Sequence, residues 1–312
     1  MSFEISLAPM IDITTANYRK LVRMSSQEVV LFTEMIVSST VVHIDREKLK
    51  ERLGDFDSKT VVQLGGSDPE EVCKAVKILV EMGYNLFNLN LGCPSTRVQK
   101  GCFGAVLMKD VKLIVRIINK VYEDTSVILS LKIRTGVDEF DTYDFFRGFI
   151  IFIVENTPVN TFYVHARKCW LKGLSPKQNR NVPPLNYEFV HKIKEEMPHL
   201  KFIINGGIKT MKHIDEHRNL DGVMIGRAAM DNVFIFHNLF NDDIFHFKIH
   251  IVYSYLISFG HSTILNYKIA FPIQNIMFGR KGCKQYKIAL AEQLKKKVTV
   301  SEFIFNIHKF IY

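Results

Sequence analysis

Strand-like and helix-like segments alternate along the first three quarters of this 312-residue chain. Short runs of β-branched and other apolar residues recur between polar or turn-forming residues, which is typical of buried strands. Eight such runs predict strands at residues 5–8, 29–33, 60–64, 86–91, 127–133, 161–165, 201–205 and 222–225. Apolar residues at helical spacing fill most of the intervals, as in 69–82, which Pro69 opens, and in 111–122.

Eight strand and helix units in about 235 residues predict an α/β fold of the (β/α)8 TIM-barrel class. The alternative is a doubly wound open sheet, which favours a glycine-rich phosphate turn after its first strand, and Ala8-Pro9-Met10 is not such a turn. Residues 237–312 lose the alternation and predict helices at 282–297 and 301–311. We therefore expect a barrel domain over residues 1–236 and a small helical domain over residues 237–312.

Positive charge is concentrated in the second of these domains. The chain has a net charge of +9, and residues 237–312 carry 10 basic and 4 acidic side chains against 31 and 28 in residues 1–236. This distribution favours a polyanionic partner such as nucleic acid, with a solvated basic face as the alternative. A hydrophobic content of 47% excludes an intrinsically disordered chain.

The five cysteines and the apolar segments exclude other classes of protein. No C-x-x-C pair occurs, so the spacing fits neither a zinc site nor a disulfide framework, and we expect no metal. No signal peptide begins the chain, and no apolar run is long enough to span a bilayer. We expect a cytoplasmic monomer without membrane association.

Polar residues and glycines follow seven of the predicted strands, where the carboxyl ends of barrel strands form active sites. Asn205-Gly206-Gly207 and Gly226-Arg227 follow the last two strands, a common phosphate site, although a pair of tight turns is the alternative. Lys132 lies in an apolar strand and needs a charge partner, which the pyrimidine edge of a reduced flavin supplies.

Gln63 and His165 fit the same ligand. The amide of Gln63 offers a donor and an acceptor for the imide edge of a flavin ring. His165 suits the phosphate or the ribityl chain, with a satisfied core histidine as the alternative.

Cys93 is the candidate catalytic residue. It stands between Gly92 and Pro94, on a sharp loop after the strand at 86–91, rather than within a packed element. A thiol with an ordinary pKa is mostly protonated at pH 7, so a cysteine at this place can act as a general acid.

Two spans without acidic residues suggest contacts to RNA. The span between Glu155 and Glu188 carries five basic residues and Trp170, the single tryptophan, and follows the sixth strand. The other runs from Ile244 to Ala291. Basic loops with an aromatic residue beside a pocket suit a nucleic acid whose target base is turned into the site, with two solvated surfaces as the alternative.

These residues resemble the flavin-dependent tRNA-dihydrouridine synthases. The resemblance rests on segments across residues 5–235, namely Ala8-Pro9-Met10, Thr33-Glu34-Met35, Val62-Gln63-Leu64-Gly65-Gly66, Asn88-Leu89-Asn90-Leu91-Gly92-Cys93-Pro94-Ser95, Arg97-Val98-Gln99, Phe103-Gly104-Ala105, Val164-His165-Ala166-Arg167, Asn205-Gly206-Gly207-Ile208 and Ile225-Gly226-Arg227. Residues 165–185 are similar to the A-type subfamily, which acts on uridines 20 and 20a of the tRNA D-loop.

The resemblance implies that NADPH reduces bound FMN, that a hydride passes to C6 of a flipped uracil, and that Cys93 protonates C5. It places FMN contacts at Pro9, Met10, Gln63, Lys132, His165, Asn205, Gly206, Gly207, Gly226 and Arg227. It places contacts to the D-arm of tRNA at Asn90, Lys177, Arg180, Lys284 and Lys287, the last two where the A type has arginines.

Two other functions are compatible with parts of the pattern. An FMN barrel oxidoreductase acting on a free pyrimidine, similar to dihydroorotate dehydrogenase, explains the strand ends but not the basic loop or the basic tail. A catalytically silent tRNA-binding protein explains the charge but not Cys93.

Overall fold

The computed structural model describes residues 3–239, 241 and 245–311, with side chains up to residue 307. Its contacts divide the chain into two compact units. The barrel unit comprises Met1–Asp12 and Val30–Gly226, and the helical unit comprises Ile13–Val29 and Arg227–Tyr312.

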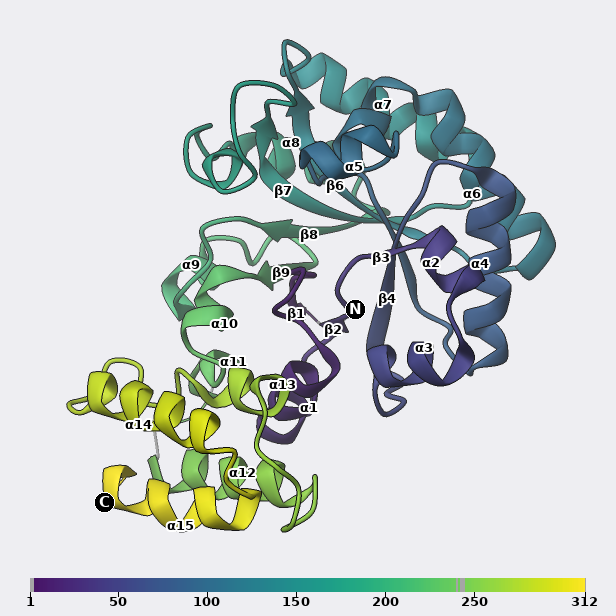
Figure 1. Cartoon of the computed structure of the whole chain (residues 1–312). Coiled ribbons are helices and arrows are strands. Elements are labelled where there is room, and N and C mark those ends of the chain that lie inside the picture. Colours follow the sequence, from purple (N-terminus) through teal and green to yellow (C-terminus); the bar gives the residue numbers. More distant parts are fainter. Residues whose placement is uncertain (1–2, 240, 242–244, 312) are drawn as a thin grey trace. The chain divides into compact units, whose positions relative to one another are not determined.

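A parallel sheet forms the centre of the barrel unit (Figure 1). Its strands are β1 (Glu4–Leu7), β2 (Leu31–Phe32), β3 (Ile36–Val37), β4 (Thr60–Gly65), β5 (Phe87–Asn90), β6 (Ser130–Val137), β7 (Thr161–Cys169), β8 (Lys201–Asn205) and β9 (Gly222–Ile225). They follow the order β1-β9-β8-β7-β6-β5-β4-β2, with β3 paired to β4.

Backbone hydrogen bonds close this sheet into a barrel. The Leu7 amide donates to the Val30 carbonyl at 2.9 Å, and the Val30 amide donates to the Ile5 carbonyl at 3.0 Å. Residues just before β2 thereby pair with β1, which stands at the opposite end of the strand order. The predicted barrel is confirmed, and the open sheet is excluded.

Apolar side chains from non-adjacent strands fill the barrel interior. One buried cluster contains Ala8, Phe32, Val61, Tyr163, Ile203 and Met224. Phe32 of β2 packs edge-to-face on Tyr163 of β7, with ring centroids 4.9 Å apart, although these strands are not neighbours in the sheet. The contact therefore crosses the interior, as expected for a barrel filled by layers of side chains.

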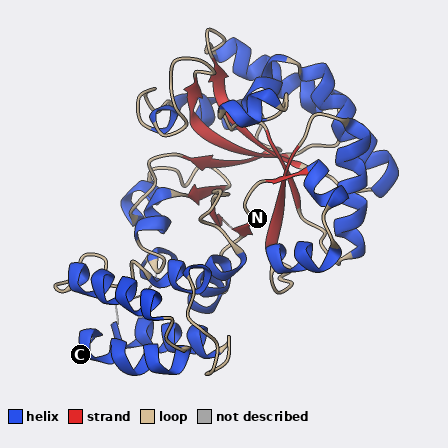
Figure 2. Cartoon of the chain, viewed as in Figure 1, coloured by secondary structure: helices blue, strands red, loops and turns tan. Residues whose placement is uncertain are grey.

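Helices surround the strands (Figure 2). They are α2 (Ser38–His43), α3 (Arg46–Leu53), α4 (Pro69–Glu81), α5 (Thr96–Lys100), α6 (Val111–Thr125), α7 (Tyr143–Asn156), α8 (Glu188–Glu196) and α9 (Met211–Asp215), with 3-10 turns η1 (Gly104–Lys109) and η2 (Gln178–Arg180). The sequence of α4 explains why this helix forms. Asp68 caps its start by accepting from the Glu71 amide at 2.8 Å, and Val72, Val76 and Leu79 form its buried face.

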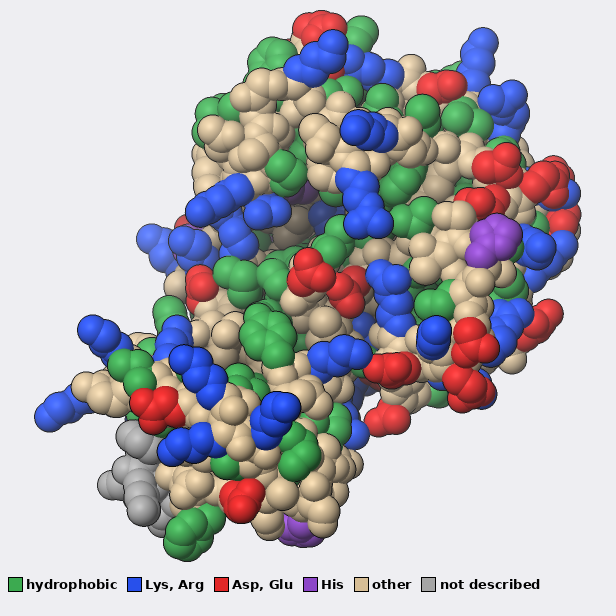
Figure 3. Space-filling view, viewed as in Figure 1, with side chains coloured by type: hydrophobic (Ala, Val, Ile, Leu, Met, Phe, Trp, Pro, Cys, Tyr) green, Lys and Arg blue, Asp and Glu red, His purple; other side chains and the backbone are tan. Residues whose placement is uncertain are grey.

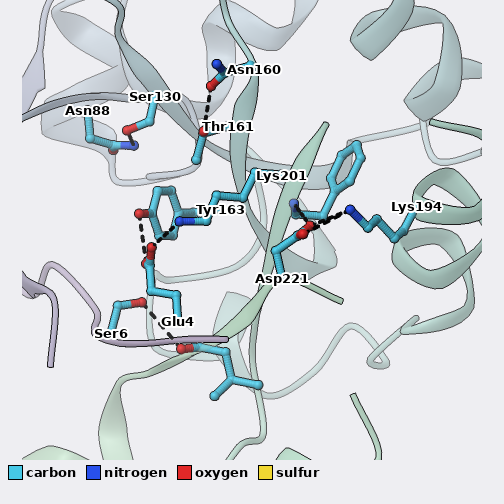
Figure 4. Close-up of polar contacts among 12 residues, drawn as sticks. Glu4, Ser6, Asn88, Ser130, Asn160, Thr161, Tyr163, Lys194, Lys201 and Asp221 are labelled. Atoms are coloured by element: carbon cyan, nitrogen blue, oxygen red, sulfur yellow. Dashed lines mark hydrogen bonds and ion pairs between the residues drawn. The ribbon is translucent and has the colours of Figure 1, made fainter. Parts of the chain in front are cut away.

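A polar cluster joins strands at their amino ends (Figure 4). Glu4, the first residue of β1, accepts from the Tyr163 hydroxyl at 2.9 Å and from Lys201 Nζ at 2.7 Å. These contacts join β1 to β7 and β8 at the end of the barrel opposite to the predicted site.

The helical unit contains α1 (Ala16–Ser25), α10 (Arg227–Asp231), α11 (Ile235–Asn238), α12 (Phe245–Ile257), α13 (Tyr267–Ala270), η3 (Phe271–Ile273), α14 (Cys283–Lys296) and α15 (Val300–Ile311). Tyr18, Leu21 and Val22 form a buried face of α1, which contacts α12. In the helical unit, the Asn17 amide also donates to the Lys268 carbonyl at 3.1 Å.

The division differs from the predicted boundary after residue 236. Residues 13–29 and 227–236 group with the C-terminal helices, because α1 buries its apolar face in that unit. In the part of the chain that the structure describes, no helix combines the length and the apolarity needed to cross a bilayer.

Candidate active site

The loop after β8 has the geometry of an anion cradle. Gly206 and Gly207 have φ angles of +114° and +80°, a conformation that residues with side chains rarely adopt. A Cβ atom on Gly206 would lie 2.8 Å from Leu185 and 2.9 Å from the His165 ring, and one on Gly207 would lie 2.5 Å from the Tyr187 hydroxyl. Both positions therefore require glycine, and the bare backbone amides lie beside the His165 imidazole.

Lys132 of β6 lies next to this loop. Its Nζ donates to Asn205 Oδ1 at 3.2 Å, and Asn205 Nδ2 donates to the Met224 carbonyl at 2.8 Å. Removal from water, together with the nearby charge of Arg134, lowers the pKa of Lys132 from 10.5 to about 7. An anionic group bound here would favour the charged ammonium.

Arg134 is the second cation of β6 at this end and is almost fully buried, at 4% exposure. It donates to the backbone carbonyls of Gly92 at 3.1 Å, Asn179 at 3.1 Å and Lys168 at 3.4 Å. Burial lowers the pKa of this guanidinium. Because these acceptors are neutral, they leave its positive charge to act on the site.

A chain of amide side chains runs from the barrel interior to the Cys93 loop, which we define as residues 91–95. Gln63 donates to Asn88 Oδ1 at 2.7 Å and accepts from Asn90 Nδ2 at 2.8 Å. Asn90 Oδ1 in turn accepts from the amides of Gly92 at 3.2 Å and Cys93 at 3.0 Å. The predicted flavin contact Gln63 and the predicted tRNA contact Asn90 are therefore hydrogen-bonded to each other below Cys93.

Cys93 is partly exposed, and its thiol lies 3.6 Å from the Ser95 hydroxyl. Its carbonyl accepts from the Ala105 amide at 3.0 Å. Gly104, with a φ of +73°, passes so close that a Cβ atom would lie 2.6 Å from the Cys93 carbonyl oxygen. The Cys93 backbone is thus held on both sides, by Asn90 and by the start of η1.

The segment after β7 forms the basic loop, which we define as residues 170–183. Lys177 and Arg180 are exposed on it, while Asn179 is fully buried. Trp170 is 37% exposed, and Lys168 Nζ lies 4.4 Å from the centre of its ring. Two predicted tRNA contacts, Lys177 and Arg180, thus stand on the basic loop, whereas the third in the barrel unit, Asn90, ends β5.

Figure 3 shows a hollow in the face of the barrel unit, with Lys and Arg side chains gathered around it. Met10 also belongs to this end, because a Cβ atom on Gly226 would lie 3.7 Å from its sulfur. Pro9 directly follows Ala8, whose amide donates to the Ile225 carbonyl at 2.8 Å.

Three predicted site residues belong to the helical unit. Arg227 begins α10, and Lys284 and Lys287 are exposed one turn apart on α14. The predicted contacts of these three residues, to FMN for Arg227 and to tRNA for the two lysines, stay predictions.

Sequence reasoning missed Tyr187, Asn88 and Asn179 as parts of the site. Tyr187 donates to the Gly206 carbonyl at 2.7 Å, and Asn179 accepts from the Trp170 amide at 2.8 Å. Of the three, only Asn88 could have been predicted from the sequence. It stands two positions before Asn90 in a buried strand, so the two side chains face the same side of the sheet.

A flavin fits the donor set of the barrel unit. Gly206 and Gly207, which we call the glycine loop, offer backbone amides beside an imidazole, which suits a phosphate. Lys132 and Gln63 offer a cation and an amide, which suit the pyrimidine edge of the ring. Burial and Arg134 lower the pKa of Lys132, and an anionic edge of a bound ring would favour its charged form.

Comparisons with known proteins agree with this site. The family model described as "Dihydrouridine synthase (Dus)" matches residues 6–299. The tRNA-dihydrouridine(20/20a) synthase of Pasteurella multocida (strain Pm70) is 42% identical over 228 residues, covering 73% of this chain and 69% of that protein. The enzyme of the same name from Synechocystis sp. (strain ATCC 27184 / PCC 6803 / Kazusa) is 40% identical over 243 residues, covering 78% of this chain and 72% of that protein.

Among solved structures, a 2-naphthoyl-CoA reductase aligns with a TM-score of 0.55 at 8% identity, covering 75% of this chain and 49% of that one. At this identity the likeness concerns the fold alone. The family model spans the Cys93 loop and the loop at Gly206 and Gly207, and the two relatives each cover about three quarters of this chain. The chain therefore belongs to the dihydrouridine synthase family, whose members are flavin-dependent oxidoreductases.

Proposed function

We propose that this chain is a tRNA-dihydrouridine synthase that reduces the C5=C6 bond of uridines 20 and 20a in the D-loop of tRNA. The observation that carries the proposal is the Cys93 loop, which Asn90 holds beside Gln63 at the carboxyl ends of the strands. One barrel mouth then contains the partly exposed thiol of Cys93, a set of donors suited to a flavin, and the basic loop. The two relatives bear the name of this activity.

Residues of the barrel mouth would hold FMN by its two ends. The amides of Gly206 and Gly207, with His165, suit the phosphate, and Lys132, Asn205 and Gln63 suit the ring. We assign further contacts to Pro9, Met10, Gly226 and Arg227 from their places after β1 and β9. Flavin held here and reduced by NADPH would provide hydride chemistry toward C6 of a uracil placed beside these residues.

Cys93 supplies the proton that completes the reduction. Its thiol donates the proton to C5, the sulfur keeps the electron pair as a thiolate, and a proton from solvent restores the thiol. Asn90 holds the amide of Cys93, so that the thiol keeps its place while the proton moves.

Four exposed cations would bind the RNA backbone. Lys177 and Arg180 stand on the basic loop, and Lys284 and Lys287 stand on α14. Arg180 is suited to bidentate phosphate contact, whereas the lysines act as point charges. Asn90 retains one amide hydrogen that suits the flipped base.

We also propose that the enzyme acts as a cytoplasmic monomer without a metal. Hydride transfer from a flavin and proton transfer from one thiol require neither a Lewis acid nor a second subunit. The cytoplasm provides both tRNA and a reduced nicotinamide.

Mapping of dihydrouridine tests the activity and its position. The purified protein should carry a yellow flavin, and with NADPH it should convert D-loop uridines 20 and 20a of unmodified tRNA. A free pyrimidine such as orotate or uracil should not reoxidise the reduced enzyme. A colourless protein that leaves tRNA unchanged would overturn the proposal.

Replacement of the thiol tests the proton donor. We expect Cys93→Ala to keep flavin content and tRNA affinity but to lose turnover by roughly 100-fold to 10,000-fold, the usual share of a general acid. Cys102→Ala is the matched control, because this exposed free cysteine stands nine positions away, outside the Cys93 loop. Unchanged turnover of Cys93→Ala would remove Cys93 from this role.

A further inference from the structure

The side chain of Gln99 bridges the Cys93 loop and the basic loop. Gln99 lies on α5, and its Nε2 donates to the Pro94 carbonyl at 2.7 Å and to the Leu171 carbonyl at 2.8 Å. An amide nitrogen has two hydrogens, so both are committed to these acceptors. One acceptor adjoins Cys93, and the other lies 72 positions away from Gln99 in the basic loop.

Arg134 makes a second bridge between the same two loops. It donates to Gly92, directly before Cys93, to Lys168 near the end of β7, and to Asn179 in the basic loop. β6 stands between β5 and β7 in the sheet, so Arg134 is placed to reach the loops on both sides. The carbonyls on either side of Cys93 are therefore both held by side chains that also hold the other loop.

Hydrogen bonds connect the two ends and the middle of the basic loop. Asn179 accepts from the Trp170 amide at 2.8 Å and donates to the carbonyls of Trp170 at 2.9 Å and Leu174 at 3.2 Å. Asp138 Oδ1 accepts from the Leu171 amide at 2.8 Å. Lys177 and Arg180 thus lie in a loop that hydrogen bonds connect to the carbonyls that Gln99 and Arg134 hold.

We propose that Gln99 and Arg134 are positioning residues that couple the basic loop to the proton-donor loop, so that contact of the RNA backbone with Lys177 and Arg180 sets the placement of Cys93. The inference rests on the proposed function, because it assigns an effect to tRNA at the same site. Its physical basis is that reaction rates depend steeply on alignment, and a displacement of about 1 Å can cost roughly 100-fold.

The test separates positioning from mere support of the fold. Gln99→Met removes both hydrogen bonds and retains a side chain of similar length. The flavin-loaded variant is first reduced by NADPH without tRNA, and the reoxidation of its reduced flavin by unmodified tRNA is then followed in a single turnover. Binding of tRNA is measured separately on the oxidised protein.

We expect Gln99→Met to keep flavin content and the NADPH reaction, and to slow reoxidation by tRNA roughly 10-fold to 100-fold with a much smaller change in tRNA affinity. Gln178→Met is the matched control, because Gln178 lies in the basic loop and accepts from the Ser175 amide at 2.9 Å without reaching the Cys93 loop. That control should keep the parent rate. Arg134→Lys, which retains the charge but has one donor nitrogen, should be slowed less than Arg134→Met.

A second substitution tests the coupling itself. In the parent, Arg180→Ala should lower both tRNA affinity and the reoxidation rate. In the Gln99→Met background it should lower the rate by less than in the parent, because one of the two bridges is already lost.

Four outcomes are distinguishable. Reoxidation of Gln99→Met at the parent rate would overturn the inference, and so would a loss that only follows a loss of flavin. Additive effects of Arg180→Ala and Gln99→Met on the rate would overturn the coupling. Failure of the parent to be reoxidised by tRNA would instead overturn the proposed function.

Discussion

At the scale of single residues, the Cys93 backbone depends on glycine at position 104. The φ of +73° at Gly104 is strained for other residues, and a Cβ atom there would also lie 2.5 Å from Val98 and 2.6 Å from the Cys93 carbonyl. This residue is separated from Cys93 in the sequence by a helix, so its role follows from the close approach and not from a local pattern.

We therefore expect Gly104→Ala to lose turnover per bound flavin as well as stability. The left-handed conformation alone costs about 1–2 kcal/mol for alanine, and the contact with the Cys93 carbonyl forces a further shift of the loop. Gly83→Ala is the control, because Gly83 has a φ of +94° and its Cβ atom would meet only Phe56 at 3.7 Å. Urea unfolding should show that Gly83→Ala also loses stability, whereas its turnover per bound flavin should match that of the parent. Equal turnover in the Gly104→Ala and Gly83→Ala variants would contradict the expectation.

Lys132 predicts a pH dependence of the flavin-free protein. The pKa of Lys132 is about 7 in the folded chain against 10.5 for the ordinary group. Between these values the unfolded chain binds more protons than the folded chain, so the folded state gains stability as pH rises from about 7 toward 10.5. Below about pH 7 the group is charged in both states, and its destabilising effect is at its full value.

Lys132→Met removes this titration. We expect the flavin-free variant to have a higher free energy of unfolding than the flavin-free parent near pH 7, with a difference that shrinks by about pH 9.5. Urea unfolding at the two pH values measures it, and the variant should also bind flavin more weakly. A difference that is independent of pH would show that Lys132 titrates normally.

At the scale of elements, the start of α8 supports the loop after β8. Tyr187 stands at the N-cap of α8 and donates to the Gly206 carbonyl at 2.7 Å. In a trans peptide the carbonyl and the next amide point in opposite directions, so this bond aims the Gly207 amide away from Tyr187. The ring of His217 packs edge-on against the ring of Tyr187, with centroids 4.5 Å apart. Burial lowers the pKa of His217 to about 4, so the imidazole that packs on Tyr187 is uncharged at neutral pH.

Tyr187→Phe should therefore weaken FMN and spare riboflavin. Loss of one hydrogen bond of about 0.5–1.5 kcal/mol that orients the amide predicts a roughly 2-fold to 12-fold rise in the dissociation constant of FMN. Riboflavin lacks the phosphate, so its affinity should not change. Tyr143→Phe is the control, because that hydroxyl donates to Glu196 at 2.8 Å, away from the glycine loop. An equal loss for both ligands would place Tyr187 against the ring.

At the scale of the whole molecule, α14 adds a second basic surface in another compact unit. Lys284 and Lys287 are exposed on one face of this helix, and the first turn of α14 lies in the span without acidic residues. Two charged surfaces on one chain can share one RNA, which raises the affinity for a folded tRNA above that for a short oligonucleotide.

We expect the double variant Lys284→Ala and Lys287→Ala to weaken tRNA binding at low salt, and the difference from the parent to shrink at high salt. Phosphate contacts release counterions, so the slope of affinity against salt should fall by about 1 to 2. Lys48→Ala with Lys112→Ala is the control of equal net charge, on α3 and α6 of the barrel unit. If the α14 double variant binds tRNA as tightly as the parent at low salt, this surface does not contact tRNA.

The agreement between sequence and structure also varies with scale. All eight predicted strands are present, because buried strands and turn residues are local signals in the sequence. β6 and β7 extend to residues 137 and 169, beyond the predicted ends, because they continue to pair past a bulge at the rim. The unit boundary was not predictable, because which neighbour buries the apolar face of α1 is a tertiary choice.

By itself the sequence determined the barrel, the strand ends that carry polar residues and the family, since each depends on residue types in a local order. The tertiary structure decided which of these residues touch. Gln99 of α5 meets Leu171, Arg134 of β6 meets Asn179, and Gly104 meets the Cys93 carbonyl across an intervening helix. No local pattern records such contacts, because they arise only when closure of the barrel brings the carboxyl ends of its strands together.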